Sequence, residues 1–543
     1  MPATHEVLNQ PPPLADYNVF EADQALVDGV CRGEAAWALE HLKQMGQLAG
    51  SEEWQYRATL ANGYPPVLRT HDRFGNRIDE VEFHPAWHEL MTAAVGFGLH
   101  ASPWRKARPG AHVARAAGFL IWSQVESGHL CPISMTFASI PVIRRQPELA
   151  REWEPRLVSD KYEPHLALHK RSALCGMAMT EKQGGSDVRA NTTRAMPQGD
   201  GAYQLTGHKW FCSAPMCDVF LILAQTSAGL GCFLLPRILP DGTRNRFLIQ
   251  RLKDKLGNRS NASSEIELDG TWARLIGEEG RGVPVIAEMV NATRLDCVLG
   301  TAALMRQAFA AAAHHTSHRA AFGKRLIDQP LMRSVLADLA LESEAATTLA
   351  LRLARAADCA EVSEHEAHLK RLGTALGKYW VCKRGPAVVA EALECLGGNG
   401  YVEDSGLPRL YREAPLNSIW EGAGNVQTLD VLRVLSRTPD MAEALLDEID
   451  EARGGDQRLD RAVTALRQEL PRAVQMEGQA RRLSERLALL LQASLLVRFS
   501  VPAVADAFCA TRLDRDGGFA FGTLSPSADV TGILDRAWHQ TKV

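Results

Sequence analysis

The feature that most constrains the fold is a change in the spacing of apolar residues near positions 176 and 280 of this 543-residue chain. Between these positions the apolar residues form short runs: Tyr203–Leu205, Lys209–Phe211, Val219–Ala224, Cys232–Pro236, Phe247–Leu252 and Ile266–Leu268. Turn signals such as Gly199-Asp200-Gly201 separate the runs. Short strands joined by tight turns at this spacing predict a small antiparallel sheet or barrel.

The flanking regions have the three- and four-residue apolar spacing of helices. Upstream it is clear through Trp87–Leu99 and Val113–Val125, after a proline-rich arm. Downstream it continues through Val283–Arg319, Pro330–Asp358 and Glu364–Leu396, which predict a bundle.

The chain is therefore expected to be mostly α with a small central β domain. We divide it into an N-terminal arm and helical domain (1–175), a β domain (176–280), a helical bundle domain (281–439) and a C-terminal helical domain (440–543).

Composition limits which partners the protein can bind and which cell compartment suits it. A net charge of -4 gives no overall attraction to nucleic acid or to anionic membranes. The 11 cysteines are odd in number and contain no CxxC pair, which favours a reducing compartment and gives no metal site. The N-terminus does not resemble a signal peptide, and the apolar stretch Leu487–Val497 is shorter than the ~20 residues of a membrane span. We predict a cytoplasmic protein with no membrane partner and no bound metal.

One loop at the start of the β region has the residue types of a ligand contact. It runs from Met177 to Asp187 and contains Gly184 and Gly185 between Thr180 and Ser186. Adjacent glycines let the backbone approach a ligand, and hydroxyls offer hydrogen bonds. Taken alone, the pattern favours an ordinary turn over a ligand contact, and its spacing excludes a Walker A loop or a GxGxxG fingerprint.

Five short motifs in a fixed order are far more specific than that loop. They are TEKQGGSD (180–187), GHKWFCS (207–213), RAAFG (319–323), LGGNGY (396–401) and IWEGAGN (419–425). Together they resemble the acyl-CoA dehydrogenase superfamily, over roughly residues 80–435. RLKDKLGNRSNAS (251–263), LYRE (410–413) and the additional C-terminal helical region look like the adaptive-response (AidB) branch of that superfamily.

The resemblance implies an acyl-CoA dehydrogenase-like fold, extended by the C-terminal domain, that binds FAD. It assigns these residues to the chain's own cofactor: Met177, Met179, Thr180, Gly185, Ser186, Phe211, Ser213, Trp420 and Asn425. It assigns Arg319, Phe322, Gly397 and Gly398 to the FAD of a neighbouring subunit. A homo-oligomer, most often a tetramer, follows from that sharing.

Glu421 matches the superfamily's catalytic base, which takes the α-proton of an acyl thioester. An apolar pocket would suit a carboxylate in this role because burial makes it a stronger base, and Ile419 and Trp420 are the apolar neighbours. Arg294 is expected either to contact Glu421 or a substrate, or to form a helix-end ion pair. Ala423 departs from the superfamily's usual threonine.

The C-terminal helical region carries a local excess of +4 charges, from nine arginines against five acidic residues between Arg453 and Arg498. Charge alone favours a solvated helix face with internal ion pairs. The branch resemblance instead implies double-stranded DNA as a partner, and we assign its contacts to Arg481, Arg482 and Arg486.

The leading functional hypothesis is an FAD-containing acyl-CoA dehydrogenase-like protein of the DNA alkylation response that binds duplex DNA and retains at most weak acyl-CoA dehydrogenase activity. One alternative is a metabolic acyl-CoA dehydrogenase whose C-terminal helices serve dimerisation. Another is a flavin oxidase of small nitrogenous compounds.

Overall fold

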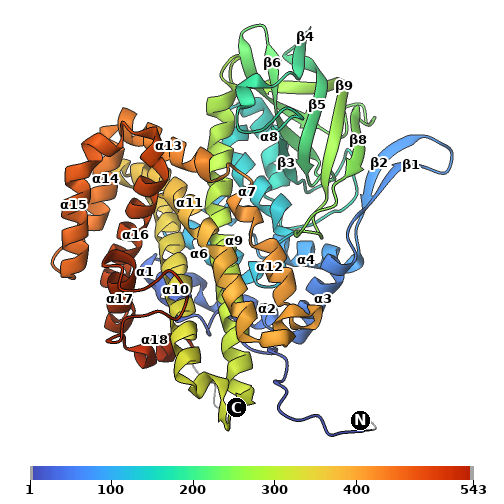
Figure 1. Ribbon diagram of the computed structural model, residues 1–543. Coiled ribbons are helices and arrows are strands. Elements are labelled where there is room, and N and C mark those ends of the chain that lie inside the picture. The colour runs from blue at the N-terminus through green and yellow to red at the C-terminus, as the bar shows by residue number, and fades with distance from the viewer. Residues whose placement is uncertain (1–3, 539–543) are drawn as a thin grey trace. The chain divides into compact units, whose positions relative to one another are not determined.

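The computed structural model describes residues 4–538, so residues 1–3 and 539–543 of the first and last predicted regions lie outside it. The chain forms two compact units (Figure 1). Of the described residues, the first unit contains 4–52, 109–124 and 294–538, and the second contains 53–108 and 125–293.

The second unit combines helices with the predicted β region. Its helices are α3 (Glu52–Gly63), α4 (Pro85–Gly96), α5 (Ser102–Arg105), α7 (Leu130–Arg144) and α8 (Pro147–Leu157). A hairpin of β1 (Val67–His71) and β2 (Arg77–Glu82), which the sequence did not predict, interrupts these helices. Its strands are only partly buried, so they lack a clear apolar alternation.

Seven strands form the β region of this unit. They are β3 (Cys175–Ala178), β4 (Arg194–Gly199), β5 (Ala202–Ser213), β6 (Val219–Thr226), β7 (Gly229–Pro236), β8 (Phe247–Leu252) and β9 (Ser263–Ile276). The predicted apolar runs lie in five of them, β5 to β9, with Tyr203–Leu205 and Lys209–Phe211 in the single strand β5, whereas β3 and β4 were not predicted. Hydrogen-bonded pairing runs β6-β4-β5-β9-β7 and returns from β7 to β6, which closes a barrel. β3 and β8 extend it by pairing with β6 and β9, and the strands are visible at the top of Figure 1.

The barrel is held by an apolar core. Every residue from Val219 to Ala224 of β6 is buried, and the rings of Phe220 and Phe247 stack with their centroids 4.9 Å apart. Cys212 and Cys217 are buried and belong to this core.

The first unit is built from helices. They are α1 (Gln24–Arg32), α2 (Leu39–Ala49), α6 (Ala111–Ser123), most of α9 (Gly282–His318), α10 (Pro330–Cys359), α11 (Glu364–Cys395), α12 (Leu407–Glu413), α13 (Gly424–Arg437), α14 (Pro439–Asp450), α15 (Gln457–Ala473), α16 (Ala480–Phe499), α17 (Pro502–Phe508) and α18 (Val530–Ala537). A two-stranded hairpin, β10 (Ala320–Ala321) and β11 (Lys324–Arg325), follows α9. The three long predicted helices therefore form within a few residues of the expected bounds.

Local sequence signals explain where these helices begin. Pro330 occupies the first turn of α10, where its missing N–H costs nothing. The Ser363 side chain caps α11 by accepting a hydrogen bond from the Glu366 backbone N–H. α10 and α11 then pack along each other (Figure 1).

Buried and partly buried ion pairs attach the C-terminal helices to this bundle. Arg352 of α10 pairs with Glu366 of α11 at 2.8 Å and with Glu448 of α14 at 2.6 Å, and Glu448 also pairs with Arg498 of α16 at 2.7 Å. Arg512 pairs with two acidic residues of α10. Much of the C-terminal arginine charge is therefore used within the first unit.

Among residues 4–538, no helix combines the length and apolarity that a membrane span requires.

Candidate active site

Glu421 lies in a strained turn that precedes α13. Its backbone φ is +59°, in the left-handed region that non-glycine residues rarely adopt. Gly422 follows at φ +101°, and a Cβ there would lie 2.7 Å from Nε2 of Gln427. Strained residues of this kind persist only where the surrounding contacts fix them, and they concentrate at functional sites.

Three side chains fix this turn by donating to its carbonyl oxygens. The buried Lys378 of α11 donates from Nζ to Trp420 O at 2.7 Å and to Gly422 O at 2.8 Å, on either side of Glu421. Arg294 Nε donates to Glu421 O at 3.0 Å, and Gln427 Nε2 donates to the same oxygen at 2.9 Å. Sequence reasoning missed Lys378 and Gln427, which have no motif of their own.

Arg294 lies inside α9 and not at a helix end, and it combines a contact with the backbone of Glu421 and an ion pair. It contacts Glu421 through the backbone oxygen, and its Nη1 forms an ion pair with Asp430 Oδ2 at 3.0 Å. Arg371 pairs with the other oxygen of Asp430 at 2.7 Å. Burial acts to raise the pKa of Asp430, but the two guanidinium groups outweigh it and hold that pKa below its usual value. Arg294 is thus a charged link between α9, α13 and the turn.

Trp420 is anchored from its indole nitrogen. Its Nε1 donates to Asn417 Oδ1 at 2.9 Å, and Asn417 Nδ2 donates to Thr301 Oγ1 of α9 at 3.1 Å. Ile419 is 61% exposed, so the turn alone does not provide the enclosed apolar setting expected from the sequence. A bound ring or a second chain would have to complete it.

Asn425, which the sequence assigned to the cofactor, contacts an arginine that the sequence assigned to DNA. Arg481 Nε of α16 donates to Asn425 Oδ1 at 2.7 Å. The first-turn residue Gly424 also lies close to Lys383. Ala423 occupies the cap position of α13 with no side chain able to cap it. Two cations therefore lie beside the beginning of this helix.

In the second unit, the predicted cofactor loop begins in β3 and continues beyond it. Met177 is buried in β3, Met179 O accepts a hydrogen bond from Asn191 Nδ2 at 2.8 Å, and Thr180 O accepts one from Trp210 N at 2.8 Å. Gly185 packs on Thr180 so tightly that a Cβ would lie 2.4 Å from Thr180 Oγ1. Ser186 is exposed.

A buried ion pair stabilises that loop. Glu181 accepts from Lys209 Nζ at 2.8 Å and from the backbone N–H groups of Thr192 and Thr193, and both charged side chains are fully buried. Burial acts to raise the pKa of Glu181, but Lys209 and these donors hold it well below its usual value. Both residues lie inside the motifs TEKQGGSD and GHKWFCS, which was the available signal for a pairing that the sequence did not predict.

Phe211 and Ser213 extend the same surface from β5. The bond from Trp210 N to Thr180 O joins β5 to the loop, so these motif segments are brought together. Phe211 is 50% exposed, and Lys253 Nζ lies 4.5 Å from the centroid of its ring. Ser213 Oγ lies 3.4 Å from Ser263 Oγ.

The four residues assigned to a neighbour's cofactor lie on exposed segments of the first unit. Phe322 is at the tip of the β10–β11 hairpin, fully exposed, with a φ of +53°. Arg319 precedes the hairpin. Gly397 and Gly398 are exposed, and nothing lies within 4 Å of a Cβ placed at either one.

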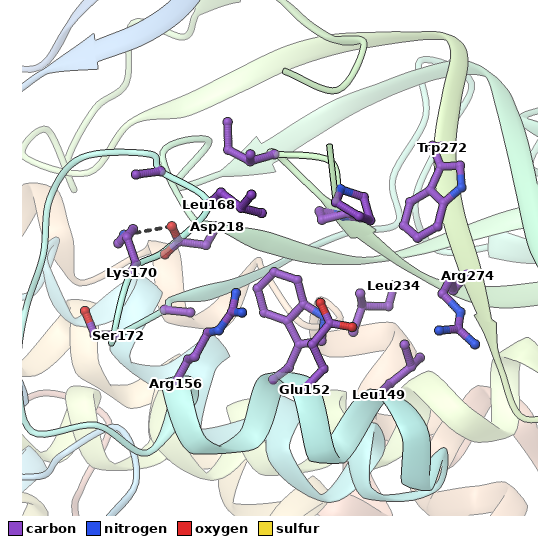
Figure 2. A pocket seen from close by; sticks show the side chains of 16 residues that line it. Leu149, Glu152, Arg156, Leu168, Lys170, Ser172, Asp218, Leu234, Trp272 and Arg274 are labelled. Carbon is purple, nitrogen blue, oxygen red and sulfur yellow. Dashed lines mark hydrogen bonds and ion pairs between the residues drawn. The ribbon is translucent and has the colours of Figure 1, made fainter. Parts of the chain in front are cut away.

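A separate pocket of about 150 Å³ opens in the second unit and contains none of the predicted site residues (Figure 2). Trp153 and Trp272 line it together with Glu152 and Arg156 of α8. The ion pair of Lys170 with Asp218, at 2.7 Å, lies on one side. We assign no chemistry to this pocket.

The chemistry of the motif residues fits FAD. In the second unit, hydroxyls of Thr180, Ser186 and Ser213 offer hydrogen bonds for polar ring edges, and the exposed Phe211 suits the face of a flat ring. In the first unit, cations beside Gly424 suit phosphate oxygens, and the exposed Ile419 offers a second apolar surface.

Comparisons with known proteins give the family. The AidB N-terminal domain model, described as that of the adaptive response protein AidB, matches residues 9–164. Acyl-CoA dehydrogenase middle and C-terminal domain models match residues 176–271 and 280–436.

Individual relatives agree with these matches. AidB of Escherichia coli (strain K12) is 48% identical over 519 residues, covering 95% of each chain. Caenorhabditis elegans ACDH-11 in complex with C11-CoA superposes with a TM-score of 0.88 at 26% identity, covering 100% of this chain and 99% of that one. An acyl-CoA dehydrogenase complexed with FAD from Bacillus anthracis shares the fold, with a TM-score of 0.66 at 18% identity, covering 79% and 81%. The chain therefore belongs to the FAD-dependent acyl-CoA dehydrogenase family, in the branch of the adaptive response protein AidB.

Proposed function

We propose that the protein dehydrogenates an acyl-CoA thioester and that Glu421 is its base. The observation that carries this proposal is the turn at Glu421, a carboxylate residue at φ +59°. Arg294 donates to the Glu421 oxygen, and Lys378 donates to the backbone oxygens on either side of it. A family relative crystallised with C11-CoA supports the choice of substrate class.

The chain's own residues supply the proton step. The Glu421 carboxylate would take the proton from the carbon next to the thioester carbonyl. The hydrogen bonds of Lys378, Arg294 and Gln427 to the turn would keep the Glu421 backbone in place. FAD, when bound, supplies the hydride acceptor for the adjacent carbon. Met177, Met179, Thr180, Gly185, Ser186, Phe211, Ser213, Trp420 and Asn425 would hold it.

Glu421→Gln tests the assignment, because an amide of nearly the same shape cannot accept the proton. We expect FAD content to be unchanged and turnover of acyl-CoA thioesters to fall by ~10²–10⁴, the usual contribution of a positioned general base. Flavin reduction by a series of acyl-CoAs is followed as bleaching of its absorbance, and an artificial electron acceptor dye that reoxidises the flavin gives the turnover rate. Unchanged turnover would place the base elsewhere.

Two further outcomes separate the alternatives. Ala423 lacks the hydroxyl of the superfamily's usual threonine, so the leading hypothesis expects weak acyl-CoA turnover. Rapid turnover by the wild-type protein would instead favour the purely metabolic dehydrogenase. Flavin reduction by small nitrogenous compounds, with none by acyl-CoAs, would favour the oxidase.

We also propose that the protein binds double-stranded DNA in the alkylation response, which the adaptive-response description of the matched domain supports. The present contacts of the three assigned arginines differ. Arg486 pairs with Glu469, and Arg481 is bonded to Asn425. Within residues 4–538, the side chains of Arg472 and Arg482 are exposed and form no hydrogen bond or ion pair.

Salt dependence of duplex affinity tests the DNA proposal. Replacing Arg481, Arg482 and Arg486 together by Ala should weaken binding and flatten the logarithmic salt slope, by about one unit for each of these arginines that binds a phosphate. Arg482→Ala alone should give most of this effect. Arg461→Ala, which removes an arginine paired with Asp514, is the matched control. Absence of duplex binding by the wild type near physiological salt would remove DNA from the proposal.

The same proposal includes a homotetramer in the cytoplasm. The fully exposed Phe322 and the open Gly397–Gly398 segment support a shared cofactor site between copies. All eleven cysteines are free thiols, which supports a reducing compartment.

A further inference from the structure

We infer that residues 9–12 of the N-terminal arm form a strap that positions the two segments by which one chain reaches the FAD of a second copy. The inference rests on the proposed function, because it takes Arg319, Phe322, Gly397 and Gly398 as the reaching residues. Its own observations are the contacts of Asn9, Gln10 and Pro12.

Asn9 binds the hairpin as a neighbouring strand would. Its Nδ2 donates to Ala320 O at 2.8 Å, and its Oδ1 accepts from Ala320 N at 2.7 Å. Arg319 Nη1 donates to Asn9 O at 2.6 Å. One arm residue therefore fixes both the backbone of β10 and the guanidinium that precedes it.

The next arm residues extend the attachment. Gln10 Oε1 accepts from Asn399 Nδ2 of the glycine segment at 3.4 Å, and Pro12 O is 2.8 Å from His314 Nε2 near the end of α9. The hairpin and the Gly397–Gly398 segment are about 75 residues apart in sequence, and the arm touches both. The prolines at 11–13 restrict the backbone of this part of the arm.

The hairpin tip shows why it needs such support. Phe322 and Gly323 both have positive φ, at +53° and +78°, so a bulky aromatic side chain is held in a strained turn. It is also fully exposed. A large apolar residue held in strain and without cover suits insertion into another surface, and β10 and β11 are only two residues each. The strap adds the hydrogen bonds that so short a hairpin lacks.

Asn9→Gly is the central test. Asn9 itself has a φ of +57°, so glycine keeps the backbone conformation and removes only the amide. We expect the FAD dissociation constant to rise about tenfold, the effect of losing ~1.4 kcal/mol of hydrogen bonding. Flavin fluorescence titration measures the affinity, and light scattering measures the oligomer. Glu6→Ala, an exposed residue of the same arm, is the matched control and should bind FAD as the wild type does.

A double-variant cycle distinguishes positioning from a merely structural role. If the strap acts through Arg319, Asn9→Gly should add little to the loss caused by Arg319→Ala. Wild-type FAD affinity in Asn9→Gly, or losses that simply add in the double variant, would overturn the strap. Wild-type affinity and oligomeric state in both Arg319→Ala and Phe322→Ala would instead overturn the proposed shared cofactor site.

Discussion

Replacing Glu421 by glycine and by alanine, and comparing the stabilities of the two variants, tests the strained turn directly. Both variants lack the carboxylate, so its interactions cancel in the comparison. What remains is the cost of a Cβ at φ +59°.

The sign and size of the stability difference between the two variants follow from two opposing free-energy contributions. A left-handed conformation costs an L-residue roughly 1–2 kcal/mol, which glycine avoids. Glycine loses roughly 0.4–1 kcal/mol through the greater freedom of its unfolded chain. We expect Glu421→Gly to be more stable than Glu421→Ala by about 1 kcal/mol.

The order should reverse at an ordinary helical position. Gln468 is exposed in the middle of α15 of the same unit, and there alanine should exceed glycine by about 1 kcal/mol. Guanidinium unfolding of all four variants, followed by circular dichroism, gives the two differences. If alanine is as stable as glycine at position 421, the turn is not left-handed in solution, and strain no longer supports a functional role for Glu421.

Two more predictions concern buried charges. Lys378→Met removes two charge-assisted hydrogen bonds, each worth ~1.5–3 kcal/mol, so the unfolding midpoint and flavin retention should both fall; an unchanged melting curve and flavin content would show that this lysine does not hold the turn. Burial acts to raise the pKa of Glu126, but hydrogen bonds from His129 lower it to about 2 from 4.5. A depressed carboxyl pKa stabilises the fold above the unfolded value, so the advantage of the wild type over Glu126→Gln should shrink by about 3 kcal/mol between pH 6 and pH 2. A pH-independent difference in denaturation midpoint would contradict this.

Much of the fold follows from local sequence patterns. Glycine-containing turns and short apolar runs place β5 to β9, because a strand needs only a short apolar run and a turn at each end. Pro330 and Ser363 mark where α10 and α11 begin, since their effects act within one helical turn. The β1–β2 hairpin escaped prediction because its half-exposed strands lack that alternation.

Some features of the candidate site likewise follow from the sequence, and others depend on the tertiary structure. The sequence by itself determined the family motifs, including Glu421, because residue types and order define them. Only the tertiary structure decided that Arg294 and Lys378 hold the Glu421 turn, that Asn9 binds Ala320, and that most C-terminal arginines have acidic partners. The physical reason is distance. The sequence gives the net charge of a region by counting its residues. The electrostatic energy of each charged side chain depends instead on which groups, distant in sequence, the packing brings within a few ångströms of it.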